Sequence, residues 1–260
     1  MAPGKLKIDI RRQKILEQLN HDGQVSVAKL SKDLDTTPVT IRNDLDALAR
    51  EGRLERIQGG AVCVHHGYSP YFAADNGASV YQMEKQAIAQ RALEYIQDGD
   101  TLFINSGSTT LAVAQALSKR KWLNVVTNSL AVANCLAHQV TIRVVLLGGE
   151  LNADYGFTYG GDAVEQLRRY QPAWSILSVD GVDAQHGITT YHAEEAMLDR
   201  MMMDQAHKTI VVADHRKIGK AGFTRICGIS TQHILITDSG CDDAMLEPMR
   251  SAGATVCVAD

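Results

Sequence analysis

The chain has 260 residues, of which 45% are hydrophobic and 22% charged, enough for one large domain and a small one. A membrane span needs about 18 to 20 consecutive apolar residues, and no run of this sequence approaches that length. The N-terminus is basic and polar, unlike a signal peptide, so we expect a soluble, cytoplasmic protein. The five cysteines are scattered without a C-x-x-C pair, which argues against a zinc site and a disulfide framework.

Charge divides the chain into two parts. The net charge is -4, but residues 1–62 hold 11 Lys and Arg against 9 Asp and Glu, or +2, which leaves -6 for residues 63–260. A small basic module attached to a larger acidic body indicates a division of labour between them.

The first 62 residues predict three short helices. Apolar spacing predicts one helix over residues 8–19, another over 28–34 after a capping Ser26, and a third over 38–50 that begins with a proline. The tight turn between the last two is typical of a helix-turn-helix. Residues 53–62 follow as a β-hairpin wing.

The third helix has two faces. Ile41, Leu45 and Leu48 fall on one stripe that must face the core. The opposite face offers apolar, hydroxyl, guanidinium and amide groups, which read bases and phosphates in a major groove. The residues predicted to contact a double-stranded DNA operator are Thr37, Val39, Thr40, Arg42, Asn43, Arg53 and Arg56. The alternative is a three-helix module that binds proteins.

A linker is predicted over residues 63–79, which are rich in Gly, His and Asn without periodicity, and the body over residues 80–260. The paired histidines of the linker lack further ligands nearby, so we expect no metal and no cofactor. In the body, continuous apolar runs alternate with helical segments, as in a parallel sheet buried on both faces. The predicted strands are 101–104, 124–127, 142–147, 174–179, 209–213, 233–237 and 254–258.

In an open α/β sheet the ligand lies at the carboxyl ends of the strands. The turn 105–110 follows the first strand and opens a helix, so backbone N–H groups and hydroxyls converge there and form an anion site, unless they serve only as a helix cap. Hydroxyls, amides, glycines and carboxylates after the other strands, with Lys217 or Arg216 to balance charge, suit a phosphorylated sugar. The predicted effector residues are Asn105, Ser106, Gly107, Ser108, Thr109, Thr110, Thr127, Asn128, Ser129, Gly148, Gly149, Asp180, Gly181, Asp183, Asp214 and Lys217.

Both parts resemble the DeoR-type bacterial transcriptional regulators. The winged helix-turn-helix resemblance lies in Thr40-Ile41-Arg42-Asn43-Asp44-Leu45, Leu48, Glu51-Gly52, Leu54 and Gly59-Gly60-Ala61. The sensor-domain resemblance lies in Asn105-Ser106-Gly107-Ser108-Thr109-Thr110, Thr127-Asn128-Ser129, Leu146-Leu147-Gly148-Gly149, Asp180-Gly181-Val182-Asp183, His186-Gly187-Ile188-Thr189, Glu194-Glu195-Ala196 and Asp214-His215-Arg216-Lys217. The resemblance implies an α/β protein with a winged helix-turn-helix followed by a Rossmann-like, ribose-5-phosphate-isomerase-like, mostly parallel sheet.

The chain departs from its relatives at three positions. Family members usually carry an arginine in place of Asn43, often a histidine in place of Gln58, and commonly an aspartate in place of Asn105. The first two lie on the predicted DNA face. We expect Asn105 to contact the sugar end of the ligand and to set specificity.

The resemblance also bears on catalysis. Asp180, Asp183 and Glu195 resemble the carboxylates of the isomerases in placement, which adds Glu195 to the predicted effector site. The isomerases also place a lysine between the Asp pair and the Glu, and residues 184–207 contain none. We therefore expect binding without turnover. The alternative is a sugar-phosphate isomerase or deaminase with a DNA-binding appendage.

The function that the resemblance implies is regulation of a carbohydrate uptake or catabolism operon, most often repression, with DNA affinity set by a phosphorylated sugar. A symmetric operator requires a homo-oligomer, a dimer or a tetramer, so that two modules bind two half-sites.

Overall fold

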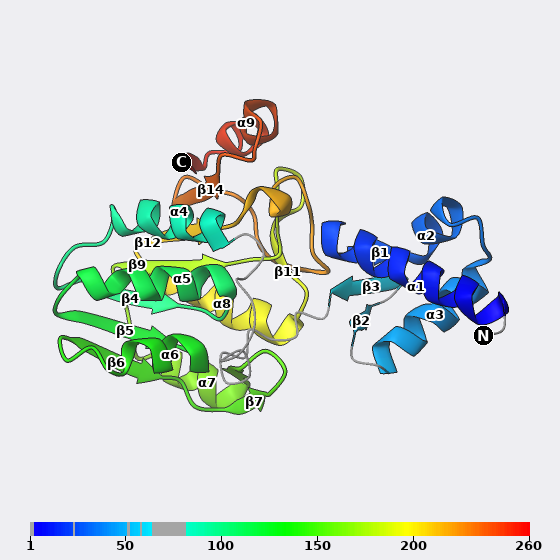
Figure 1. Ribbon diagram of the computed structural model, residues 1–260. Coiled ribbons are helices and arrows are strands. Elements are labelled where there is room, and N and C mark those ends of the chain that lie inside the picture. The colour runs from blue at the N-terminus through cyan, green and yellow to red at the C-terminus, as the bar shows by residue number, and fades with distance from the viewer. Residues whose placement is uncertain (1–2, 23, 51–52, 58, 64–81) are drawn as a thin grey trace. The chain divides into compact units, whose positions relative to one another are not determined.

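The structure is a computed structural model that describes residues 3–22, 24–50, 53–57, 59–63 and 82–260 (Figure 1). The chain divides into two compact units, Met1–Gly67 and Tyr68–Asp260. Each unit has its own hydrophobic core. The predicted linker, residues 63–79, lies outside the described residues apart from Cys63, so its extent stays a prediction.

The first unit has the predicted winged helix-turn-helix architecture. Its elements are α1 (Pro3–Asp22), β1 (Gln24–Ser26), α2 (Val27–Asp33), α3 (Pro38–Arg50), β2 (Leu54–Ile57) and β3 (Gly60–Cys63). The strands form an antiparallel sheet in the order β1-β3-β2, in which β2 and β3 are the wing. Ser26 caps α2 as predicted, because its Oγ accepts the N–H of Lys29 at 3.1 Å. Helix α1 begins earlier than predicted, since its first residues have no apolar periodicity to reveal them.

A seven-stranded sheet forms the centre of the second unit, and every pairing in it is parallel. Its strands are β4 (Thr101–Ile104), β5 (Leu123–Thr127), β6 (Ile142–Leu146), β9 (Trp174–Ser178), β12 (Lys208–Val212), β14 (His233–Asp238) and β15 (Thr255–Ala259). All seven predicted strands are present, with ends that differ by at most one residue. The predicted α/β class is therefore confirmed.

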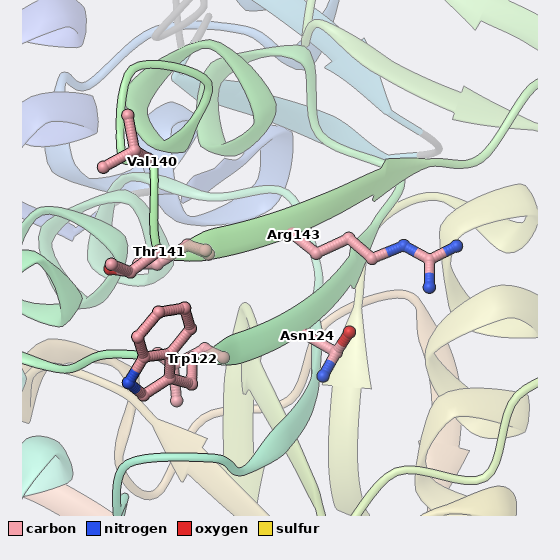
Figure 2. A pocket seen from close by; sticks show the side chains of 7 residues that line it. Trp122, Asn124, Val140, Thr141 and Arg143 are labelled. Atoms are coloured by element: carbon pink, nitrogen blue, oxygen red, sulfur yellow. The ribbon is translucent and has the colours of Figure 1, made fainter.

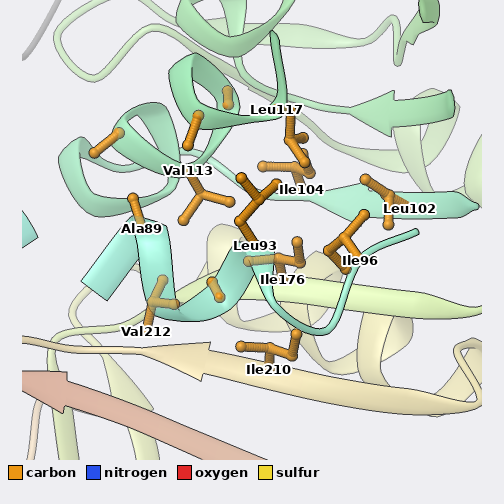
Figure 3. Close-up of a cluster of buried hydrophobic side chains, with 14 of the residues drawn as sticks. Ala89, Leu93, Ile96, Leu102, Ile104, Val113, Leu117, Ile176, Ile210 and Val212 are labelled. Atoms are coloured by element: carbon orange, nitrogen blue, oxygen red, sulfur yellow. The ribbon is translucent and has the colours of Figure 1, made fainter. Parts of the chain in front are cut away.

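Helices cover both faces of this sheet. The helices are α4 (Gln82–Leu93), α5 (Ser108–Ala116) and α6 (Leu130–Leu136) on one face, and α7 (Gly161–Leu167), α8 (Ala193–Gln205) and α9 (Asp243–Ser251) on the other. Leu102 and Ile104 of β4 pack into the first layer (Figure 3), whereas Phe103 between them packs into the second. Because successive side chains of a strand point to opposite faces, burial on both faces requires the continuous apolar runs seen in the sequence.

Two smaller sheets lie outside the central one. They are the pair β7 (Glu150–Asn152) and β8 (Phe157–Tyr159), and the antiparallel sheet of β10 (Gly181–Asp183), β11 (Gly187–Thr190) and β13 (Thr224–Cys227). Strands β10 and β11 were not among the predicted strands. Each is too short to show a period of its own, and β13, the second partner of β11, is distant in the sequence. Among the described residues, no helix combines the length and apolar character that crossing a membrane requires.

The order of the strands indicates one place where a ligand is expected to bind. The order is β15-β14-β12-β9-β4-β5-β6, so β4 pairs with β5 on one side and with β9 on the other. Strands β5 and β6 extend the sheet on one side of β4, and β9 and the later strands extend it on the other side. In open α/β sheets the ligand binds outside the carboxyl ends of the strands at such a reversal. The turn after β4 and the segment after β9 are therefore the centre of the candidate effector site.

Candidate functional site

The N-terminal half of α3 presents an open polar surface. Thr37 caps the helix, since its Oγ1 accepts the N–H of Thr40 at 3.2 Å and lies 2.9 Å from the Thr40 hydroxyl. Val39 is 62% exposed although it is apolar, and Arg42 and Asn43 are exposed beside it. An exposed apolar residue flanked by a guanidinium and an amide is the composition expected of a helix that reads a major groove.

The same helix carries a buried carboxylate that the sequence reasoning missed. Asp44 lies between Ile41 and Leu45 on the inward stripe, and its carboxylate accepts hydrogen bonds from Arg11 at 2.5 Å and Arg12 at 3.1 Å. Its position three residues after Ile41 and one before Leu45 was a signal that it faces inward. Two basic residues of α1 therefore fix the orientation of α3.

Arg56 of the wing does not present a free guanidinium. Its Nε lies 2.9 Å from Oδ1 of Asp46 on α3, and its Nη1 donates to the carbonyl of Gly60 at 2.8 Å. These contacts join the wing to α3, so the predicted DNA contact of Arg56 competes with bonds that hold the fold. Arg53, the other predicted wing residue, is exposed.

We expect Asp44→Ala to destabilise the N-terminal unit by about 3 kcal/mol, the lower end of the range for breaking a buried ion pair, because both arginines keep partial contact with solvent. Urea unfolding of the full chain, followed by far-UV circular dichroism, measures this. Asp46→Ala is the matched control, since its side chain is 55% exposed and its ion pair contributes about 1 kcal/mol or less. Equal losses in the two variants would contradict the role assigned to Asp44.

The turn between β4 and α5 closes tightly onto β9. The hydroxyl oxygen of Thr110 lies 3.1 Å from the carbonyl oxygens of both Asn105 and Gly107, so its one proton is shared between them. A Cβ on Gly107 would lie 1.8 Å from Oγ of Ser178, so only glycine fits there. Ser106 and Ser108 keep intermediate exposure, and the first N–H groups of α5 have no partner within the helix. The turn can therefore hold an anion with hydroxyls and backbone N–H groups.

Asn105 differs from its prediction. Its side chain is fully buried, its Nδ2 donates to the Ser178 carbonyl at 2.9 Å and to the Asp199 carboxyl at 3.0 and 3.1 Å, and its Oδ1 accepts the Ser178 N–H at 2.9 Å. Both ends of the amide are occupied by the protein, so the expected direct contact with the sugar is wrong for this arrangement. Asn105 instead links the ends of β4 and β9 to α8, behind the crevice.

Charged side chains gather beside this turn. The hydroxyl of Thr190 lies 2.9 Å from Asp180 Oδ2 and 2.8 Å from Glu195 Oε2. Lys217, in the short helix η2 (His215–Lys217), donates to the Val179 carbonyl at 2.6 Å and faces Asp180 Oδ1 at 3.3 Å. Burial, and after it the charge of Asp180, raise the pKa of Glu195 to about 8. Residues 184–207 contain no lysine, and the lysine beside Asp180 comes from η2 instead.

Two residues of this neighbourhood were not predicted. Burial raises the pKa of Asp199 well above its usual value, and nearby Glu195 adds to the effect. Asp199 follows Glu195 by four residues, so both lie on one face of α8, which was the available signal. Burial lowers the pKa of Lys85 on α4 to about 8, while Asp214 opposes the shift and Lys217 adds to it. No sequence pattern linked Lys85 to these groups.

Ser106 and two aromatic rings form a rim near the turn. The Ser106 hydroxyl donates to the Tyr155 carbonyl at 3.4 Å, and the ring centroids of Tyr155 and His192 lie 4.5 Å apart in an edge arrangement. Tyr155 follows β7, and His192 immediately precedes α8. No sequence pattern placed His192 beside this turn.

Several predicted effector residues have structural roles instead. Thr127, Asn128 and Ser129 are fully buried, and Ser129 caps α6 through its hydroxyl. Asp183 accepts three hydrogen bonds within its own hairpin from Gln185 and His186, which lower its pKa.

The remaining predicted residues also serve the fold. Asp214 is buried and pairs with Arg216 through both oxygens, at 2.9 and 2.8 Å. Gly181 is buried in β10. The N–H of Gly148 is bound by Gln166, and a Cβ on Gly149 would lie 2.3 Å from the Tyr159 carbonyl. Thr109 is almost fully buried inside the turn.

A groove of about 300 Å³ lies at the opposite end of the strands (Figure 2). It is lined by Trp122, Leu123, Asn124, Val140, Thr141, Ile142 and Arg143, at the amino ends of β5 and β6. The carboxylates, Lys217 and the serine-rich turn all lie at the carboxyl ends, so this groove is not the predicted effector site. Nor do the described residues bring together three His, Cys, Asp or Glu side chains that could hold a metal ion.

Comparison with known proteins identifies the family. The profile described as "DeoR-like helix-turn-helix domain" matches residues 11–66, and "DeoR C terminal sensor domain" matches residues 81–239. A protein named "Putative aga operon transcriptional repressor" from Escherichia coli O157:H7 is 32% identical over 95% of this chain and 92% of its own length. A "Glycerol-3-phosphate regulon repressor" from Escherichia coli strain K12 is 31% identical over 88% of this chain and 90% of its own.

Among solved structures, ribose 5-phosphate isomerase A from Methanocaldococcus jannaschii has a TM-score of 0.40 and 14% identity, over 53% of this chain and 55% of its own. This structural similarity is distant. The parallel sheet of this chain is established by the pairing of its own strands. The matches to both domain profiles and to full-length regulators cover nearly the whole chain. The chain therefore belongs to the DeoR family, and it is a DNA-binding transcriptional regulator with a sensor domain rather than an enzyme.

Proposed function

We propose that this protein is a cytoplasmic repressor of a carbohydrate uptake or catabolism operon, and that a phosphorylated sugar in the crevice between β4 and β9 controls its affinity for the operator. One observation carries the proposal: the hydroxyl-rich turn that opens α5 lies at the reversal of strand order, against the Asp180, Glu195 and Lys217 cluster. A site for an anion thus lies beside a site for hydroxyl groups.

The parts of the ligand divide between these two groups. The phosphate lies at the turn, held by the hydroxyls of Ser106 and Ser108 and by the N–H groups at the start of α5, where the helix dipole favours negative charge. The sugar hydroxyls face Asp180 and Glu195, which accept or donate hydrogen bonds according to their protonation. Lys217 balances charge from the side of Asp180.

The names of the relatives support repression and a sugar-linked effector. The aga operon and the glycerol-3-phosphate regulon are named as the targets of those two proteins, and both are named as repressors. A winged helix reads one half-site, so we propose a homo-oligomer on a symmetric operator. Binding of the sugar phosphate then shifts the equilibrium between states with different DNA affinities, by the differential free energy with which it binds them.

Thermal shift tests the effector site directly. A sugar phosphate at 100 times its dissociation constant is expected to stabilise the full chain by about 2.7 kcal/mol, and Ser106→Ala with Ser108→Ala is expected to lower the affinity at least about tenfold through loss of two hydrogen bonds to a charged group. Ribose 5-phosphate, glucosamine 6-phosphate and glycerol 3-phosphate form the first panel. Ser118→Ala, which removes an exposed hydroxyl bound to the Gln115 carbonyl, is the control. An unchanged shift in the double variant would place the phosphate elsewhere.

A further inference from the structure

The Thr190 hydroxyl lies between the carboxyl groups of Asp180 and Glu195, and this position constrains the protonation of the two carboxyl groups. It is 2.9 Å from Asp180 Oδ2 and 2.8 Å from Glu195 Oε2. A hydroxyl carries one proton, so it can donate along only one of these contacts. If both carboxyls were ionised, the other contact would join two oxygens that have only lone pairs to offer. One carboxyl must therefore carry a proton and donate it to Thr190.

Asp180 is held in its ionised form by its surroundings. Its Oδ1 faces the ammonium of Lys217 at 3.3 Å, and its Oδ2 accepts the backbone N–H of Tyr191 at 3.2 Å in addition to the Thr190 contact. A cation and hydrogen-bond donors favour a charged carboxylate. The Thr190 hydroxyl therefore donates to Asp180.

Glu195 has the opposite surroundings. In the described part of the chain, Thr190 is the one hydrogen-bond partner recorded for its carboxyl. The groups that interact with it electrically are Asp180, Asp199 one turn further along α8, and the more distant cation of Lys217. Burial between two carboxyl groups favours the neutral acid, which then donates to the Thr190 hydroxyl.

The other elements packed against α8 do not offer a compensating charge to Glu195. On β8, Tyr159 interacts with Glu194 and Glu150, and on β13 Arg225 interacts with Cys227. The nearest charged partner recorded for Arg200 is Asp204.

We propose that Glu195 is a neutral acid in the unliganded site, and that its proton is what allows the crevice to accept a phosphorylated rather than an uncharged sugar. This inference rests on the proposed function for the identity of the ligand, but the proton itself does not depend on a ligand. With Glu195 ionised, a phosphate dianion in the crevice would lie near at least two negative carboxylates, and Lys217 would balance only one of these charges. With Glu195 neutral, the charges of Asp180 and Lys217 cancel. Glu195 is thus a specificity-determining residue.

Infrared spectroscopy of the unliganded full chain tests the proton. The C=O stretch of a protonated carboxyl is resolved from that of a carboxylate, and at pH 7 we expect a protonated band that is absent from Glu195→Gln and that disappears from the wild-type protein with a midpoint near about 8. Asp199→Asn identifies the separate band of Asp199. If Glu195→Gln fails to fold, the titration of Asp199→Asn still decides, because Asp199 then contributes no band. Absence from that variant of a protonated band that disappears near pH 8 would overturn the inference.

Calorimetric titration with the three sugar phosphates tests the consequence for binding. Above the midpoint, wild-type affinity is expected to fall about tenfold per pH unit, as binding linked to one proton requires. Measurements stay above pH 7, where a phosphate monoester with a second pKa of about 6 remains a dianion. Glu195→Gln keeps a neutral side chain of the same shape, so its affinity is expected to lose the part of the pH dependence that Glu195 causes and to keep only that of other groups such as Lys85, whose pKa is also about 8. The same pH slope in both proteins would overturn the inference.

The two failures are distinguishable. If none of the three ligands binds either protein while the protonated band is present and lost in Glu195→Gln, the proposed effector is wrong and the proton on Glu195 stands. If a sugar phosphate binds and the band is insensitive to Glu195→Gln, the proposed function stands and the role of Glu195 is overturned.

Discussion

Gly107→Ala is expected to abolish the response of DNA binding to a sugar phosphate while DNA binding itself persists. The added Cβ would lie 1.8 Å from Ser178 Oγ and 3.3 Å from Thr110 Oγ1. Turning the Ser178 hydroxyl away would break its hydrogen bond to the Ser106 carbonyl at 3.2 Å, and Ser178 Cβ would still lie 3.0 Å from the added carbon. The start of α5 must therefore shift, which costs about 1–3 kcal/mol in a packed interior and displaces the N–H groups that we assign to the phosphate.

Gly161→Ala is the matched control for this variant. Gly161 also begins a helix of the sensor unit, but a Cβ there meets no atom within 4 Å. Gly161→Ala should bind the sugar phosphate in calorimetric titration and respond to it in DNA binding as the wild-type protein does. Gly107→Ala should still bind DNA, but should neither bind the sugar phosphate nor change its DNA affinity when the sugar phosphate is added. Wild-type effector affinity in Gly107→Ala would remove the turn from the site.

Arg42→Ala is expected to weaken operator binding by about 1–3 kcal/mol, roughly tenfold to a hundredfold, the usual value of one good base contact. The side chain is exposed near the start of α3, so stability should change by about 0.5 kcal/mol or less. Fluorescence anisotropy with labelled duplex, measured against salt concentration, gives both the affinity and the number of phosphate contacts.

The control for Arg42 removes the same charge elsewhere. Arg169→Ala changes an exposed arginine of the sensor unit and should leave DNA affinity unchanged. If Arg42 reads a base, its loss should relax sequence preference and leave the salt slope unchanged. If it contacts a phosphate, the slope should fall by about one. Wild-type affinity for Arg42→Ala would mean that α3 is not the recognition helix.

The pattern of neighbouring residues predicted the main helices and strands, because the residues that indicate each of them lie close together in the sequence. The seven parallel strands are continuous apolar runs, since layers such as those of Leu102 and Phe103 bury both faces. Ser26 and Pro38 marked helix starts by chemistry that acts over one turn. The short strands β10 and β11 were not predicted, because each is too short to show a period and β11 completes its pairing with β13, which lies far along the chain.

The candidate site was predicted only in part, because its contacts cross the sheet. Asn105 meets Asp199 across 94 residues of sequence and Ser178 across 73, and no pattern near Asn105 indicates that its amide is used behind the crevice. Lys217 reaches Asp180 across 37 residues, and although Lys217 was predicted to balance charge in the site, no pattern near Asp180 indicates that the two residues are partners. Such pairings follow from strand order, which a single sequence does not reveal.

We propose that a phosphorylated sugar in the crevice sets the affinity of the protein for DNA. The most direct test is the affinity of the full chain for duplexes selected from a random pool, with and without each sugar phosphate that the thermal shift identifies. We expect this affinity to change by about 5-fold to 150-fold for at least one ligand, the usual range of allosteric coupling, and to stay unchanged for Gly107→Ala. An affinity for DNA that stays constant while a sugar phosphate saturates the wild-type protein would contradict it.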